Sequence, residues 1–140
     1  MSEGLTTAAL EGTHRLHRLL NSRDLDAVSD LFAPGSAWDA SRWGLGFHEA
    51  PVALRRFLQD WIGSFDRYEL TVQEASDLGN GVVFAVFLHV ATYPQGGGDA
   101  LRVRSSTVLR WRGEHLVSLT SYMNLDEARA AAEQLARELA

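Results

Sequence analysis

Apolar residues recur every three or four positions in four segments of the chain, the spacing that predicts amphipathic helices. Asp24 and Asn124 stand immediately before two of these segments, where a side-chain oxygen can cap the first helical turn. Pro34 and Gly35 end the second segment, because proline cannot continue a helix and glycine accepts the left-handed conformation that follows one. Helices are therefore expected over residues 5–20, 25–32, 51–65 and 125–139.

The other apolar positions follow a period of two, which predicts strands. A short strand is expected near 36–40, and the segment 41–50, which has two glycines and no period, is expected to be a loop. The order of elements predicts one α+β domain over residues 1–140, with helices on one face of a curved antiparallel sheet. Four longer strands are expected over 68–77, 82–93, 101–112 and 116–123, with turns at 79–81, 95–99 and 113–114.

The predicted strand 82–93 is apolar on both faces, whereas an antiparallel strand with one wet face alternates apolar and polar residues. Both faces are therefore expected to be covered, one by the helices and a pocket and the other by a partner subunit. This pattern predicts a homodimer packed sheet to sheet. His89 lies on the less uniformly apolar face and is a candidate for the dimer interface.

Charge and composition exclude several classes of function. The net charge of −5, from 13 basic and 18 acidic residues, argues against nucleic acid, because binding to it depends on neutralising phosphates. No apolar run approaches the ~20 residues of a membrane span, and the N-terminal residues do not resemble a secretion signal, so a cytoplasmic protein is expected. The chain contains neither cysteine nor lysine, which excludes a thiolate nucleophile and a lysine Schiff base. Acid–base chemistry is left to Asp, Glu, His and Tyr.

Four segments carry a resemblance to a known family: Asn21–Ala33, Ser36–Gly44, the pair Trp61 and Phe65, and Ser121–Leu135. They resemble the SnoaL-like, polyketide cyclase-like proteins of the nuclear transport factor 2-like superfamily, and the order of elements fits over essentially the whole chain. The resemblance implies a cone-shaped α+β fold, with helices packed on a curved antiparallel sheet around a pocket for a small molecule. The superfamily includes polyketide cyclases, ketosteroid isomerase, epoxide hydrolases, dehydratases and non-catalytic binders, so the fold does not determine the activity.

Residues of ketosteroid isomerase can be carried over through the similar stretch Asn21–Ala33. The catalytic Tyr of that enzyme falls at Leu16, its protonated Asp at Thr107 and its base at Ala40, so steroid isomerisation by that mechanism is rejected. SnoaL-like cyclases often have an acid near the end of the last strand, where this chain has Asn124. That difference argues against a typical cyclase.

Asp39 is the main catalytic candidate. If its side chain points inward among the tryptophans, desolvation raises its pKa and makes it a usable acid or base. Side chains alternate along a strand, so the alternative is that Trp38 points inward and Asp39 outward. His48, in the predicted loop before the third helix, is the second acid–base candidate, with a surface or capping role as the alternative.

The remaining candidates would line the pocket. Trp38, Trp43, Trp61 and Phe65 could form its apolar wall, although core packing explains Trp61 and Phe65 equally well. Thr107 and Tyr122, with Tyr68 and Ser105, could offer hydroxyls to a ligand or be satisfied within the sheet.

No metal or other cofactor is expected. His14 and His17 are three positions apart on a predicted helix, but no acidic third ligand has a metal-like spacing. The sequence therefore predicts a small-molecule pocket protein, acting by cofactor-free acid–base chemistry on an apolar secondary metabolite. Cyclisation, isomerisation, dehydration and epoxide opening are the reactions considered. The alternatives are a non-catalytic ligand-binding domain and a dimerisation domain.

Overall fold

The computed structural model describes residues 7–93 and 99–140. Its helices are α1 (Ala8–Asn21), α2 (Leu25–Leu31), α3 (Val52–Gly63) and α4 (Leu125–Glu138), which confirms the four expected helices. Both predicted caps are present, because Asp24 Oδ1 accepts from Ala27 N at 3.2 Å and Asn124 Oδ1 accepts from Glu127 N at 2.8 Å. Residues 5–6 of the first expected helix and 95–98 of the expected turn lie outside the described residues.

A six-stranded sheet forms the centre of the fold, in the order β2-β1-β6-β5-β4-β3. The meander of four long antiparallel strands is confirmed, and β1 adds to it in parallel with β6. The expected loop 41–50 is wrong in part, because it contains a short 3₁₀ helix, η1 (Ser41–Trp43), and a strand, β2, paired with β1. Three-residue elements are too short to show a period. The strands are β1 (Ala37–Asp39), β2 (Phe47–Glu49), β3 (Arg67–Gly79), β4 (Val82–Thr92), β5 (Asp99–Arg112) and β6 (His115–Tyr122).

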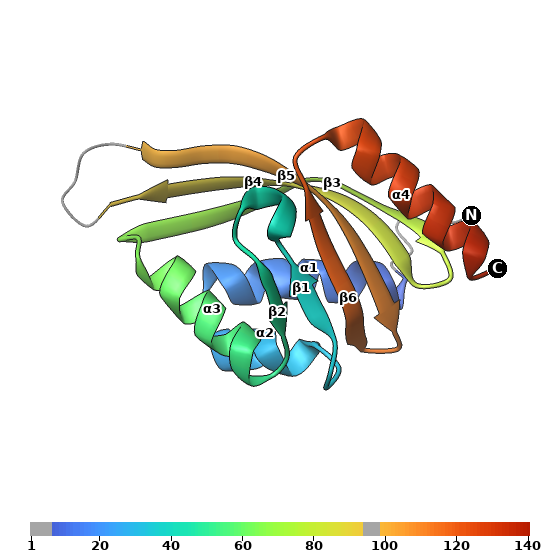
Figure 1. Cartoon of the computed structure of the whole chain (residues 1–140), viewed down its shortest axis with the longest axis horizontal. Helices are drawn as coiled ribbons and strands as arrows, with labels where there is room; N and C mark the ends of the chain where they lie inside the picture. The colour runs from blue at the N-terminus through green and yellow to red at the C-terminus, as the bar shows by residue number, and fades with distance from the viewer. Residues whose placement is uncertain (1–6, 94–98) are drawn as a thin grey trace.

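Helices cover the sheet on both sides (Figure 1). Helices α1, α2 and α3 lie on what we call the inner face, and α4 lies on the opposite, outer face. Along β4, Val83, Ala85 and Phe87 belong to the core on the inner face. On the outer face, Val82, Phe84 and Val86 pack with three small residues of α4, which are Ala128, Ala132 and Ala136.

The outer face therefore corrects one expectation from the sequence. Val82, Phe84 and Val86 are covered by a helix of the same chain, so they do not require a partner subunit. The mistake has a physical reason: alternation along a strand shows that a face is buried, but not which element buries it. Further along β4, Leu88 and Val90 on this face remain half-buried.

Hydrogen bonds join the C-terminal end of α1 to the edge strand β3. The Asn21 side chain donates to Leu70 O at 2.9 Å and accepts from Leu70 N at 2.7 Å, as a neighbouring strand would. His17 Nε2 lies 2.6 Å from the same carbonyl oxygen. These contacts hold β3 against α1 two residues from Tyr68, which lines the cavity described below.

The middle of α1 packs closely against β5. Trp111 is buried, and its Nε1 donates to Thr13 Oγ1 at 3.2 Å. Its ring lies so near α1 that a Cβ atom on Gly12 would be 2.8 Å from two ring carbons. Only glycine fits this position without displacing the ring.

We expect Gly12→Ala to destabilise the protein by about 1–3 kcal/mol, because overpacking a fixed ring costs more than the gain in helix propensity. Thermal and denaturant unfolding would measure the loss. Gly63→Ala is the matched control, since a Cβ there meets nothing within 4 Å, and it should be neutral or stabilising. Equal stability of the two variants would contradict this account of the α1–β5 contact.

Candidate functional site

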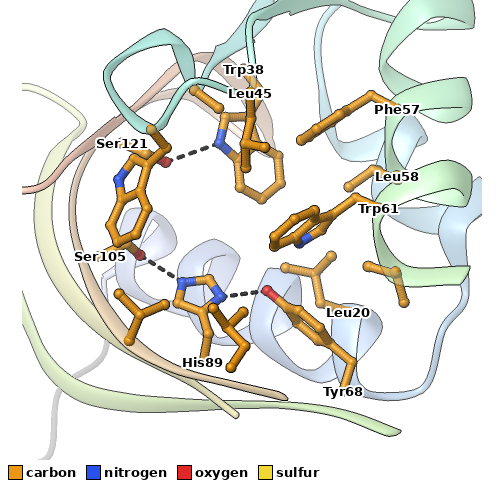
Figure 2. A pocket seen from close by; sticks show the side chains of 15 residues that line it. Leu20, Trp38, Leu45, Phe57, Leu58, Trp61, Tyr68, His89, Ser105 and Ser121 are labelled. Carbon is orange, nitrogen blue, oxygen red and sulfur yellow. Dashed lines mark hydrogen bonds between the residues drawn. The ribbon is translucent and has the colours of Figure 1, made fainter. Parts of the chain in front are cut away.

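A cavity lies on the inner face of the sheet, between the sheet, α3 and the segment 38–45 (Figure 2). Its empty volume is about 570 Å³ with the open mouth included. Most of its wall is apolar, with a few polar groups among the lining side chains. The lining residues are Leu20, Trp38, Ala40, Trp43, Leu45, Phe57, Leu58, Trp61, Ile62, Tyr68, His89, Leu101, Val103, Ser105 and Ser121.

Aromatic rings form much of the apolar wall. The Trp38 ring is stacked with Phe32 at a centroid distance of 6.3 Å and meets Phe57 edge-on at 6.2 Å. Trp61, from α3, packs edge-on against Phe65 at 5.2 Å. Because these rings touch one another as well as the cavity, the wall is held by core packing.

The polar groups form a hydrogen-bonded chain across three neighbouring strands. The Tyr68 hydroxyl of β3 is bonded to His89 Nδ1 of β4, and His89 Nε2 lies 2.7 Å from Ser105 Oγ of β5. Figure 2 shows the three side chains in line along one side of the cavity. The period of two places His89 on the same face as Phe87 and therefore on the inner face.

Burial keeps Tyr68 and His89, the two titratable residues of this hydrogen-bonded chain, uncharged. Desolvation lowers the pKa of His89 to about 4. Desolvation also raises the pKa of Tyr68 to about 12, and a hydrogen bond from Trp61 opposes that rise only in part. At neutral pH the imidazole has one donor and one acceptor nitrogen, so the hydroxyls on its two sides can donate or accept in either direction.

Asp39 is not among the residues that line the cavity. Its Oδ1 accepts from Ser41 N at 3.0 Å and from Ser41 Oγ at 2.6 Å, and its Oδ2 lies 3.7 Å from Arg42 Nη1. The side-chain hydrogen bond from Ser41 is the main reason why the pKa of Asp39 is lowered, with desolvation opposing it and Arg42 adding to it. These contacts are those of a residue that stabilises the turn at η1, and it is the neighbouring Trp38 that faces the cavity.

His48 also lies outside the lining. Its Nε2 is 2.5 Å from Leu45 O, and its ring is stacked on Phe57 with centroids 3.9 Å apart. It therefore supports two residues of the cavity wall from behind. Leu45 and Phe57 are themselves lining residues.

The other predicted pocket residues divide between the wall and its surroundings. Trp38, Trp43 and Trp61 line the cavity, and Trp43 Nε1 is buried with no hydrogen-bond partner among residues 7–93 and 99–140. Phe65 is buried in the core beside Trp61.

Two predicted hydroxyl residues are not among the lining residues. Thr107 is buried beside Ser105 on the same face of β5, with its Oγ1 3.5 Å from Ser105 Oγ. Tyr122 packs with the cluster on the outer face, and the Arg42 guanidinium lies over its ring at 4.4 Å. The alternation along β6 separates it from Ser121, which faces the cavity.

The sequence model of the SnoaL-like domain matches residues 13–119 of this chain. The chain belongs to the SnoaL-like family. A search of curated proteins finds no match. No helix in the described part of the chain is long and apolar enough to cross a membrane, and no group of three or more metal-ligating side chains occurs there.

Solved structures support the same fold. A Catenulispora acidiphila protein with a ketosteroid isomerase-like fold, in complex with trimethylamine, has a TM-score of 0.71 at 16% identity, covering 87% of this chain and 92% of that one. RV0760c from Mycobacterium tuberculosis, in complex with estradiol-17beta-hemisuccinate, has a TM-score of 0.71 at 16% identity, with 86% and 97% covered. TerC, co-crystallised with polyporic acid, has a TM-score of 0.70 at 14% identity, with 91% and 99% covered. At these identities the likeness is one of fold.

His89 is the main residue of the site that the sequence did not select. The sequence pattern makes it a candidate for the dimer interface, whereas the structure places its face, with Val83, Ala85 and Phe87, against the helices of the inner face. A signal was present, because a histidine in a run of buried apolar residues needs hydrogen-bond partners on neighbouring strands. The sequence indicates Tyr68 and Ser105 only as separate hydroxyls, because it does not show that they meet His89.

We expect His89 to make the stability of this SnoaL-like protein depend on pH. Its folded pKa of about 4 lies below the ordinary 6.5, so between these values the unfolded chain takes up a proton that the folded chain does not. The free energy of unfolding should therefore fall as pH decreases from 6.5 to 4, by up to about 1.4 kcal/mol per pH unit.

Urea unfolding across this pH range would measure the slope. His89→Gln should remove most of it, whereas His115→Gln, at an exposed position after the β5–β6 turn, should retain it. An unchanged slope in His89→Gln would show that His89 is not held neutral by burial.

Proposed function

We propose that this protein binds an uncharged, apolar ring compound in the cavity and transfers a proton to or from it without a cofactor. Among the described residues, no Asp, Glu or Arg lines the cavity. An anionic or cationic ligand would lose its hydration there and find no opposite charge. Flat apolar rings match the aromatic wall formed by Trp38, Trp61 and Phe57.

The observation that carries the proposal is the chain Tyr68–His89–Ser105, whose three members all line the cavity. A neutral imidazole can accept a proton at one nitrogen while giving one up at the other. The hydroxyls of Tyr68 and Ser105 are bonded to its two nitrogens and also line the cavity, so each can relay a proton between His89 and a ligand. His89 is the acid–base group of this proposal, because its ring nitrogens take up and give up the proton.

Proton transfer of this kind is common to cyclisation, isomerisation, dehydration and epoxide opening of an apolar secondary metabolite. Three of the structural neighbours hold small molecules, which are trimethylamine, polyporic acid and estradiol-17beta-hemisuccinate, and this supports a binding role for the pocket. The alternative function is a binder that holds its ligand without reaction. Asp39, the acid–base candidate from the sequence, is the second candidate for this role. Its variants can be tested alongside those of His89.

The test uses 2-tetralone, an uncharged bicyclic ketone whose C1 protons exchange with solvent through its enol. We expect the protein to bind it and to accelerate deuterium uptake at C1 in heavy water, followed by proton NMR. His89→Asn should lower the protein-dependent exchange about a hundredfold or more, since general acid–base groups contribute factors of this size. Calorimetric titration measures binding in parallel.

The matched control is Asp39→Asn, which removes an acid but keeps a side chain that can cap the turn at Ser41. It should retain the exchange if His89 is the acid–base group. Loss of exchange in Asp39→Asn instead would move the role to Asp39. Binding without any accelerated exchange would favour the non-catalytic binder, and no binding would reject an apolar ring compound as the ligand.

We also propose a homodimer through the outer face of the sheet. The support is the part of that face beyond α4, where half-buried Leu88 and Val90 lie beside exposed Arg102 and Arg104. Sedimentation at micromolar concentration should give the mass of a dimer, and a monomer there would contradict the proposal. A cytoplasmic location remains a prediction from the sequence.

A further inference from the structure

We infer that Ser121 is a hydrogen-bond donor that selects a ligand with a carbonyl or ether oxygen, at the opposite end of the cavity from the Tyr68–His89 pair. This inference rests on the proposed function, because it concerns the ligand of the same cavity. It adds a second polar requirement to the apolar ring. The ligand would carry oxygen at both ends.

The hydrogen bond from Trp38 determines what Ser121 can offer. Trp38 Nε1 donates to Ser121 Oγ at 3.0 Å, and an indole nitrogen is only ever a donor. A serine hydroxyl has one proton and two lone pairs, so this contact uses a lone pair and leaves the proton uncommitted. Within residues 7–93 and 99–140 the structure shows no acceptor for that proton. Ser121 is buried and lines the cavity, so a ligand oxygen can take the proton.

Ser121 lies two strands away from His89 of the acid–base chain. Ser121 of β6 is paired with Thr107 of β5, and His89 lies on β4, one strand further. His89 is paired with Val103, four residues along β5 from Thr107, so Ser121 and His89 are separated both across the strands and along them, and a bicyclic ring with an oxygen at each end can lie between them. Figure 2 shows Ser121 and Tyr68 on opposite sides of the cavity.

Selectivity follows from the cost of an unpaired donor. A ligand that covers Ser121 with a hydrocarbon edge removes water from the hydroxyl and offers no acceptor in return. A ligand with a carbonyl oxygen at the same place satisfies it. The hydrogen bond from the Trp38 indole holds the Ser121 oxygen in position for this contact.

The test compares two uncharged probes of the same ring size. One is 6-hydroxy-1-tetralone, with a hydroxyl and a ketone, and the other is 5,6,7,8-tetrahydro-2-naphthol, which lacks only the ketone. We expect Ser121→Ala to reduce the preference for the ketone probe, measured as the ratio of the two dissociation constants, by about threefold to tenfold. Ser105→Ala, the same substitution in the acid–base chain, should weaken both probes alike and leave the ratio near that of the wild type.

A second measurement does not depend on a variant. Infrared difference spectroscopy follows the carbonyl stretch of 6-hydroxy-1-tetralone. Its frequency should be lower in the probe bound to the wild type than in the probe dissolved in hexane. This shift reports a hydrogen bond to the ketone, which a purely structural role of Ser121 would not produce. In Ser121→Ala, shown to be folded by its circular dichroism, the shift should be lost.

The outcomes separate this inference from the function on which it rests. If both probes bind and Ser121→Ala leaves their ratio unchanged, Ser121 is not the donor and the inference is overturned, while the proposed function stands. A carbonyl stretch at the same frequency in the bound probe as in hexane would also overturn the inference. If neither probe binds to the wild type, the proposed function fails and the inference fails with it.

Discussion

The burial of β4 on both faces is the constraint on which the rest of the structure depends. Val83, Ala85 and Phe87 face the inner helices, and Val82, Phe84 and Val86 face α4. A strand so apolar has no side that can be left in water, so both sides of the sheet must be covered, and in this structure helices cover them. The small residues of α4 allow that helix to approach the outer face closely. The helices on the inner face carry larger side chains than α4 does. A cavity remains between these helices and the curved sheet.

The chemistry of the site is placed where this apolar pattern is interrupted. His89 continues the inner face of β4 after Phe87, and its burial is compensated by hydrogen bonds to hydroxyls on the strands either side. The same burial makes the imidazole costly to charge and so keeps it neutral near pH 7. The side chains that interrupt the hydrophobic core are thus the ones that give the cavity its polar character.

Local signals predicted local features well. The caps at Asp24 and Asn124, the helix stripes and the alternation of the long strands depend on neighbours in sequence, and the structure has them. The candidate site depended on weaker signals. Alternation near 36–40 left open whether Trp38 or Asp39 faces inward, because a three-residue strand contains too few positions to establish its register. The contacts of Asp39 with Ser41 and Arg42 arise from the η1 turn, which has no periodic signature.

The sequence by itself determined the types and order of the long elements, the uncharged nature of much of the interior and the absence of thiol and lysine chemistry, since each depends on residue type and spacing alone. Only the tertiary structure decided that α4 covers the outer face, that β1 joins β6 in parallel and that Tyr68, His89 and Ser105 meet. These last three come from strands β3, β4 and β5 and are brought together by interstrand register. Register is set by turns and packing across the whole sheet, and no local stretch of the sequence contains it.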